Sequence, residues 1–168
     1  MKPSELERIY DTHAAGLFRY LWGFTHQEAD ARDLLQEVFI KLARNGLGAK
    51  VREERAYLYR LTHNLAVDWM RRAQARRDAV GRMMREPGGA SGSLPHEDRG
   101  LVDDALAAAM DALPDDQRSV VHLKLVEGLT FEEISRAQGI PLNTAASRYR
   151  YALDKLRSCL RPLYKELS

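Results

Sequence analysis

Hydrophobic residues recur at three- and four-residue steps along most of the chain, which is the period of an amphipathic helix. The first apolar stripe covers residues 6–24, the second residues 34–42, and the third residues 58–70. No strand-like alternation of apolar and polar residues competes with these stripes. The pattern therefore predicts three helices, the third over about residues 54–77, and three helices can enclose one small core.

Several helix ends carry local signals in the sequence. Ser4 with Glu7 and Thr130 with Glu133 have the spacing of a capping box, in which each residue satisfies a backbone N–H of the other. These pairs predict the starts of two helices. A glycine at position 46 predicts the end of the second helix.

Proline, glycine and serine replace the apolar periodicity over residues 86–100, a composition typical of a flexible linker. Apolar stripes return after Leu101 and predict four more helices, the second of which opens at Pro114. The chain is therefore expected to be all-α, with two small helical domains joined by a flexible linker. The predicted domains are residues 1–85 and residues 101–168.

The last two predicted helices have the sequence outline of a helix-turn-helix. A short helix over residues 131–138 is followed by a turn that contains Gly139, a natural C-terminal cap, and then by a longer helix. We expect this longer helix to be capped by Asn143 or Thr144 and to reach about Leu160.

The longer helix has two different sides. The residues of its apolar side, which should pack inward, are Ala145, Tyr149, Ala152, Leu156 and Leu160. The candidate DNA-binding residues of the other side are Asn143, Thr144, Ala146, Ser147, Arg148 and Arg150. Backbone N–H groups and a serine at such a helix start can bind phosphate, and arginine can donate two hydrogen bonds to a guanine edge. The alternative is an ordinary surface helix whose arginine side chains merely cover apolar surface.

Charge is distributed unevenly along the 168 residues, although the formal net charge is only +2. Residues 71–85 hold six arginines against one aspartate, and residues 141–165 hold six basic residues against one aspartate. The rest of the chain is therefore acidic. Two cationic segments on an acidic body predict contact with a polyanion at two places.

The sequence contains no signal for catalysis, metal binding or a membrane span. One cysteine, Cys159, rules out an internal disulfide framework and a cysteine-rich zinc site, and the five histidines lack ligand spacing. No glycine-rich phosphate loop, carboxylate–histidine cluster or activated nucleophile is recognisable. No apolar run reaches the length of a membrane span, and the N-terminus lacks a signal-peptide core. We expect a cytoplasmic protein that is not an enzyme and has no catalytic residue, metal or cofactor.

Three segments carry a resemblance to bacterial RNA polymerase sigma factors, and most closely to their extracytoplasmic-function group. Residues 111–157, with the stretches EGLTFEEIS and TAASR, resemble the C-terminal DNA-binding domain of these proteins. Residues 28–44, EADARDLLQEVFIKLAR, resemble the helix that docks on the polymerase clamp. Residues 56–77, AYLYRLTHNLAVDWMRRAQARR, resemble the helix that opens and reads the −10 promoter element. The segments occur in the family's order and cover most of the chain.

The resemblance implies roles for the exposed polar residues. The C-terminal helix would read the −35 element. On the third helix an asparagine can read the edge of an unstacked base and arginines can follow the phosphate backbone, so the candidate −10 residues are Asn64, Arg71, Arg72, Arg76 and Arg77. Carboxylates on the second helix would repel DNA and suit a protein, so the candidate polymerase-binding residues are Asp33, Gln36, Glu37 and Lys41. A charged face that meets only water is the alternative.

The partners that the resemblance implies are core RNA polymerase, promoter DNA and an anti-sigma factor. Four residues depart from the family's pattern and bear on the DNA sequence that is read: Arg32, Ala146, Tyr149 and Tyr151. Two other function classes remain as alternatives. One is a stand-alone helix-turn-helix regulator that binds duplex DNA and dimerises through its N-terminal helices. The other is a helical nucleic-acid-processing enzyme, for which no metal or nucleophile site is recognisable.

Overall fold

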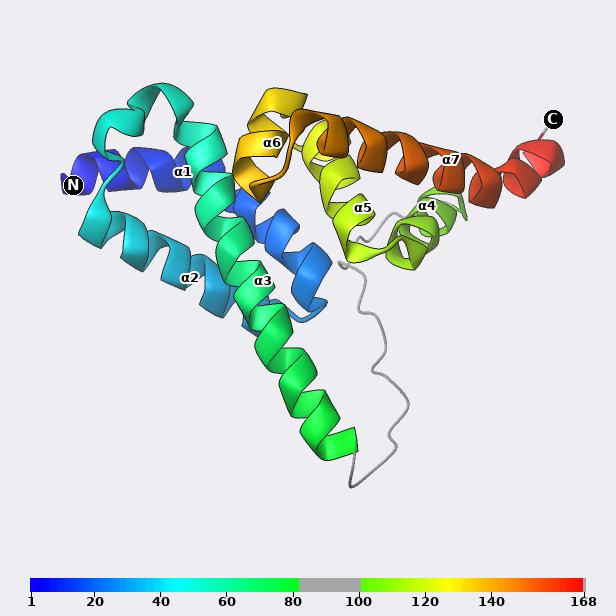
Figure 1. Ribbon diagram of the computed structural model, residues 1–168, viewed down its shortest axis with the longest axis horizontal. Helices are drawn as coiled ribbons and strands as arrows, with labels where there is room; N and C mark the ends of the chain where they lie inside the picture. The colour runs from blue at the N-terminus through cyan, green and yellow to red at the C-terminus, as the bar shows by residue number, and fades with distance from the viewer. Residues whose placement is uncertain (82–100, 168) are drawn as a thin grey trace. The chain divides into compact units, whose positions relative to one another are not determined.

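The computed structural model describes residues 1–81 and 101–167, and those residues form helices joined by short turns, without strands (Figure 1). The predicted all-α class is confirmed. Backbone contacts divide the chain into two compact units, one built on the first three α-helices and one mostly on the last four, with residues 136–139 grouped with the first unit. The predicted linker, residues 86–100, lies outside the described residues.

The N-terminal unit consists of α1 (Pro3–Thr25), α2 (Glu28–Asn45), a short 3-10 helix η1 (Gly48–Glu53) and α3 (Glu54–Gly81). Each of the three α-helices packs against the other two. The predicted stripes form the core, and its nearly inaccessible side chains include Ile9, Leu17, Leu21, Val38, Leu42 and Leu58. The last turns of α3 extend beyond α1 and α2 (Figure 1), and their side chains are exposed.

The ends of α1 and α2 are set by different backbone devices. The expected capping box of Ser4 and Glu7 is wrong, because α1 already begins at Pro3 and its N-cap residue makes no side-chain hydrogen bond. Proline suits the first position of a helix because its missing N–H has no partner there in any case. The end of α2 is as predicted: Gly46 has a φ of 63°, and its N–H donates to the Leu42 carbonyl at 2.7 Å.

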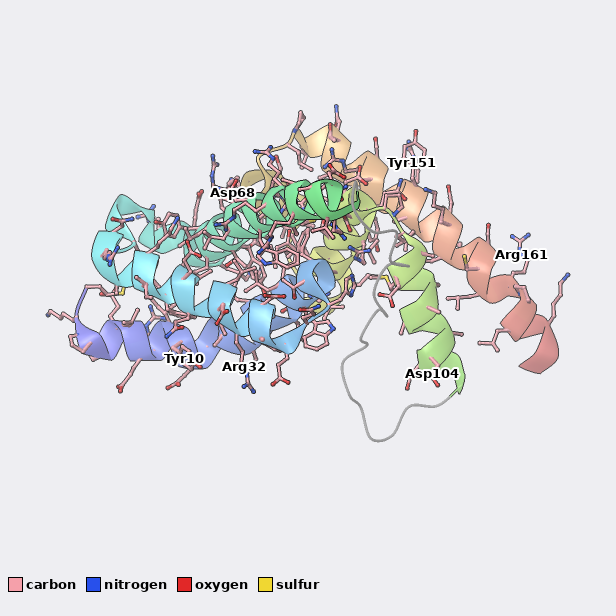
Figure 2. The ribbon with its side chains drawn as sticks, turned by 90° about the horizontal axis from the view of Figure 1, so that it is seen from below. Tyr10, Arg32, Asp68, Asp104, Tyr151 and Arg161 are labelled. Atoms are coloured by element: carbon pink, nitrogen blue, oxygen red, sulfur yellow. The ribbon has the colours of Figure 1, made fainter. Side chains whose placement is uncertain are left out.

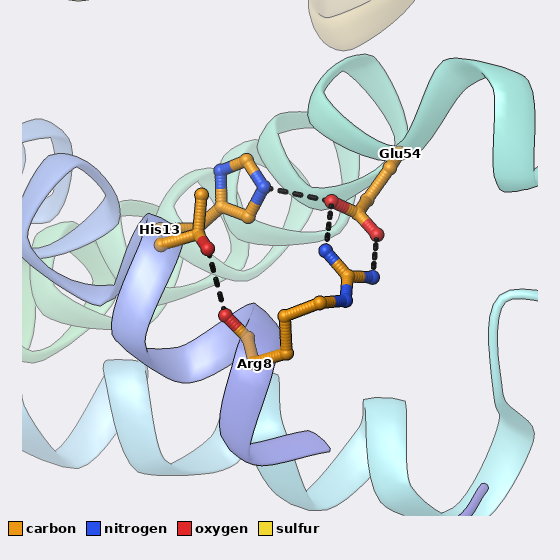
Figure 3. Close-up of polar contacts among 4 residues, drawn as sticks. Arg8, His13 and Glu54 are labelled. Atoms are coloured by element: carbon orange, nitrogen blue, oxygen red, sulfur yellow. Dashed lines mark hydrogen bonds and ion pairs between the residues drawn. The ribbon is translucent and has the colours of Figure 1, made fainter. Parts of the chain in front are cut away.

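A polar cluster joins the start of α3 to α1 (Figure 3). The Arg8 guanidinium donates to both oxygens of the Glu54 carboxylate, at 2.5 and 3.3 Å, and His13 Nε2 lies 3.0 Å from Glu54 Oε2. The hydrogen bond from Arg8 holds the pKa of Glu54 below its usual value, against the opposing effect of partial burial, and His13 contributes in the same direction. The cluster therefore links two helices of the N-terminal core through a carboxylate that is ionised at neutral pH.

The C-terminal unit consists of α4 (Leu101–Ala112), α5 (Asp115–Val121), a short π-helix η2 (His122–Val126), α6 (Phe131–Gln138) and α7 (Leu142–Leu167). The long helix α7 packs against α4 and α5. The core of this unit includes Ala109, Leu113, Val121, Ala152 and Leu156. The small side chain of Ala152 lets α7 approach its neighbours closely, so the long helix can hold α4 and α5 in fixed positions.

The joints of the helix-turn-helix match the predicted chemistry at α6. Thr130 and Glu133 form the expected capping box, with two reciprocal hydrogen bonds of 3.1 Å. After α6, Gly139 has a φ of 65°, and the Ile140 N–H donates to the Ser135 carbonyl at 3.0 Å. The short helix is thus closed at both ends, which fixes where the next helix starts.

Three predicted boundaries of this unit are corrected. Pro114 is the N-cap of α5 rather than its first residue. Neither Asn143 nor Thr144 caps α7, because the helix begins at Leu142 and the Ala145 N–H donates to the Pro141 carbonyl at 3.1 Å. The helix also does not end near Leu160, since it continues through Pro162.

Candidate functional site

The inward side of α7 is the predicted one. Ala145 and Ala152 are inaccessible to solvent, and Leu156 is buried. Tyr149 is half-buried and meets the ring of Phe131 on α6 edge-on, with ring centroids 5.4 Å apart. These contacts fix the rotation of α7 about its own axis and therefore decide which side chains face outward.

The candidate DNA-binding residues lie on the remaining side, within the first nine positions of α7. Asn143, Ala146 and Arg150 are exposed, whereas Thr144 and Ser147 are half-buried. Because the helix starts at position 142, its first backbone N–H groups lie beside these side chains and have no partner within the helix. The combination of free N–H groups, a hydroxyl, the exposed Arg150 and the half-buried Arg148 can bind phosphate and base edges.

Two arginines of α7 have neighbours that sequence reasoning did not foresee. Arg148 Nε lies 3.6 Å from Asp116 Oδ2 of α5, so this guanidinium is held at the border of the exposed side. Arg150 lies over the ring of Tyr151, 5.4 Å from its centroid. Tyr151 projects outward from α7 and is 53% exposed (Figure 2). Tyr151 therefore joins the candidate interface, and the sequence already marked it as one of the four positions that depart from the family's pattern.

The candidate −10 residues of α3 are all exposed, but they do not share one side of the helix. At about 100° per residue, Asn64 and Arg71 point in nearly the same direction, and Asp68 is turned by only about 40° from Asn64. Arg72 and Arg76 are turned toward α2, and Arg77 is turned away from Asn64. The arginines therefore surround the outer part of α3. A curved strand of DNA could contact this part of the helix from more than one direction.

Arg72 and Arg76 take part in a groove between α3 and α2. The α3 wall of this groove is made by Trp69, Arg72, Ala75 and Arg76, and the α2 wall by Asp30, Asp33, Leu34 and Glu37. The structure thus brings together two predicted sites, because two of the residues assigned to polymerase binding lie opposite two of those assigned to DNA.

A second groove lies between α1 and α2. Its apolar lining residues are Tyr10, Ala14, Ala15, Phe18, Leu35 and Phe39, and its polar lining residues are Glu28, Arg32, Asp33 and Gln36. Tyr10 belongs to the apolar stripe predicted over residues 6–24, but its side chain is 51% exposed, with its ring centroid 4.9 Å from that of Phe39. Asp33 borders both grooves, whereas Lys41 borders neither and lies 3.9 Å from Glu37.

Within the described ranges, no three histidine, cysteine or acidic side chains are grouped so that they could hold a metal ion. Across those same residues, no helix combines the length and the apolar character that crossing a membrane requires.

Two family models match the chain. Residues 9–76 match Sigma-70 region 2, and residues 109–158 match Sigma-70 region 4. These ranges contain the α2–α3 groove and the exposed side of α7, respectively. The matched order is that of the two structural units.

Curated relatives and solved structures resemble the chain over most of its length. It is 33% identical to the ECF RNA polymerase sigma factor SigE of Mycolicibacterium smegmatis over 92% of the chain, but it spans only 61% of that relative's own length. It is 32% identical to the ECF RNA polymerase sigma factor SigL of Mycobacterium tuberculosis, covering 94% of the chain and 90% of SigL.

Two solved structures share its fold. One is the sigma factor RpoE of Bartonella quintana, in complex with the anti-sigma factor NepR (TM-score 0.74, 19% identity, 94% of this chain and 97% of that one). The other is CnrH, in complex with the cytosolic domain of CnrY (TM-score 0.68, 20% identity, 96% of this chain and 90% of that one). With both family regions present in order, and with SigL covered almost completely, the chain belongs to the ECF RNA polymerase sigma factors.

Proposed function

We propose that this chain directs core RNA polymerase to specific promoters and starts transcription there, using one unit for docking and the −10 element and the other for the −35 element. The observation that carries this proposal is that each of the two matched regions, 9–76 and 109–158, presents exposed cationic side chains on a rigid helix. The chain supplies binding energy in the cytoplasm, and the polymerase performs the chemistry.

The first turns of α7 are proposed to enter the major groove at the −35 element. Arg150 is exposed and can pair with a guanine edge, while Ser147 and the helix N-terminus bind phosphate. Arg148 can contribute a further contact, because its ion pair with Asp116 is partly exposed and therefore weak. Ala146 adds no polar contact.

The outer part of α3 is proposed to hold the opened −10 strand. Asn64 is exposed and can hydrogen-bond to an unstacked base, and Arg71, on nearly the same side of the helix, can bind the adjacent phosphate. Opening DNA costs on the order of 1.4 kcal/mol for each base step, so contacts to the separated strand are needed to offset it. Arg72, Arg76 and Arg77 extend the cationic surface.

The α2 face is proposed to bind the polymerase through Asp33, Gln36, Glu37 and Lys41. Asp33 and Gln36 also border the α1–α2 groove. A docking protein could therefore contact these polar side chains and bury the apolar residues of the groove at the same time. An anti-sigma factor is proposed as a further partner, because the sigma factor RpoE, which shares the fold, was solved with one.

Gel-shift assays with and without core polymerase test the proposal against a stand-alone regulator. Promoter duplexes selected by the holoenzyme should bind tightly only when core polymerase is present. Tight and specific binding by the chain alone would favour the stand-alone helix-turn-helix regulator instead.

A further inference from the structure

Arg150 and Tyr151 form a pair on the exposed side of α7. Both side chains are exposed, and the central carbon of the Arg150 guanidinium lies over the Tyr151 ring, 5.4 Å from its centroid. At about 100° per residue, the two residues lie on either side of Ser147, one turn earlier in the helix. The pair therefore stands on the part of α7 that is proposed to enter the major groove.

The ring can hold Arg150 without using its hydrogen-bond donors. A guanidinium over an aromatic ring is attracted by the π electrons, so its N–H groups need no acceptor on the protein. Among the described residues, Arg150 forms no ion pair. Asp154 has the spacing for one, but its Oδ1 lies 3.9 Å from Arg157 Nη1 instead. The donors that a guanine edge requires are therefore open on Arg150.

Arg148 shows the opposite arrangement. It is half-buried, and its Nε lies 3.6 Å from Asp116 Oδ2, so a base must compete with this carboxylate for the guanidinium. Arg150 is oriented by a neighbour that does not compete in this way. Of the two arginines, Arg150 is thus the better prepared to donate two hydrogen bonds to one guanine.

We propose that Tyr151 is a positioning residue for −35 recognition, whose ring holds the Arg150 guanidinium in the direction from which two of its N–H groups reach one guanine. The inference rests on the proposed −35 role of α7. Tyr151 departs from the family's pattern, so this device belongs to this chain and is not a general property of the family.

The expected effect is on discrimination between bases more than on overall affinity. An arginine side chain has many rotamers, and ordering them on binding costs free energy. A ring that already restricts Arg150 lowers this cost for a guanine in the matching position. Other bases cannot accept both hydrogen bonds in the same geometry, so they gain less from the restriction.

Promoter binding by holoenzyme that contains the full-length chain tests the inference. The base pair that Arg150 reads is identified first: its replacement weakens binding by wild type but not by Arg150→Ala, as measured by fluorescence anisotropy. Discrimination is then the affinity for a duplex with G·C at this position divided by the affinity for one with A·T. We expect Arg150→Ala to lose at least about tenfold of this discrimination.

Two substitutions at Tyr151 separate the ring from the hydroxyl. Tyr151→Leu keeps apolar bulk without the ring, and we expect it to lose about threefold of the discrimination, a factor that suits an exposed cation–π contact. Tyr151→Phe keeps the ring and should retain the discrimination. Tyr151→Leu should have no further effect on discrimination when Arg150→Ala is already present. Both positions are exposed, so these substitutions remove no core packing.

The outcomes distinguish this inference from the proposed function. Loss of discrimination by Arg150→Ala but not by Tyr151→Leu leaves the −35 role of α7 standing and overturns the inference. Equal losses by Tyr151→Leu and Tyr151→Phe, or a loss by Tyr151→Leu that persists in the Arg150→Ala background, would also overturn it. If Arg150→Ala loses discrimination at no base pair, the role proposed for Arg150 is wrong, and the inference fails with it.

Discussion

Asp116 of α5 lies 3.6 Å from Arg148 of α7, so a helix outside the helix-turn-helix holds an arginine of its second helix. Arg148 is thereby placed at the edge of the exposed side of α7 rather than at its centre. The pair is partly exposed, and such pairs contribute about 0.2 to 1 kcal/mol, which a DNA contact can replace. The ion pair thus orients the Arg148 side chain but holds it weakly, which suits a side chain that is proposed to bind promoter DNA.

Replacing Arg148 by alanine is expected to weaken −35 recognition by about tenfold and to leave capture of core polymerase unchanged, because the residue belongs to the surface of the C-terminal unit that is proposed to bind DNA. Fluorescence anisotropy with holoenzyme and a promoter duplex measures the first, and co-purification measures the second. Arg161→Ala is the matched control, since Arg161 is exposed on the same helix but lies beyond the matched range 109–158 (Figure 2). Loss of both activities by Arg148→Ala would show that the residue is needed for folding.

Replacing Asp33 and Glu37 by lysine is expected to reduce capture of core polymerase at least about tenfold. The two lysines would repel the polymerase surface that the two carboxylates attract. Pull-down with tagged core enzyme gives the measurement. The same reversal at Glu7 and Asp11 on α1 is the control, and it should have little effect. Transcription in vitro that is untouched by the Asp33/Glu37 reversal would contradict the docking assignment.

The capping box at the start of α6 should be needed for the helix-turn-helix. Thr130→Ala removes the acceptor for the Glu133 N–H and is expected to cost about 1 kcal/mol of unfolding free energy in the C-terminal unit. Urea titration followed by circular dichroism measures the loss. Thr130→Ser retains the hydroxyl and should lose much less, and equal losses for the two variants would mean that the hydroxyl contributes nothing.

The Arg8–Glu54 contact predicts a pH dependence of stability. Since the pKa of Glu54 is lowered in the folded chain, its contribution is fully present above the unfolded value of about 4.3 and is lost as the pH falls through the lower folded value. Glu54→Gln should therefore be less stable than wild type at pH 7, and the difference should shrink in acid. Denaturant titrations at several pH values test this, and a difference that is independent of pH would contradict it.

Helix positions followed from the sequence wherever the apolar period and the turn chemistry agreed. The stripe through Leu17 and Leu21 predicts a buried side, and the capping box with Gly139 predicts both ends of α6. The start of α7 was misplaced because Asn143 is a common cap, whereas here the Pro141 carbonyl accepts the Ala145 N–H and the helix begins earlier. Local propensity does not decide between two neighbouring starts.

Contacts between helices did not follow from the sequence. The Arg8–Glu54 pair spans 46 residues of chain, and the groove that places Arg72 opposite Asp33 depends on how α3 is rotated against α2. The candidate residues could be selected by type and spacing. Which of them share a groove depends on packing angles, and no single-helix pattern encodes those.

Transcription in vitro by purified core polymerase, with and without this chain, over a library of genomic promoter fragments tests the central claim most directly. The account predicts that the chain joins the core enzyme and produces defined start sites, each preceded at constant spacing by two shared sequence elements. A chain that fails to bind core enzyme, or binds it without changing where transcripts begin, would contradict the account.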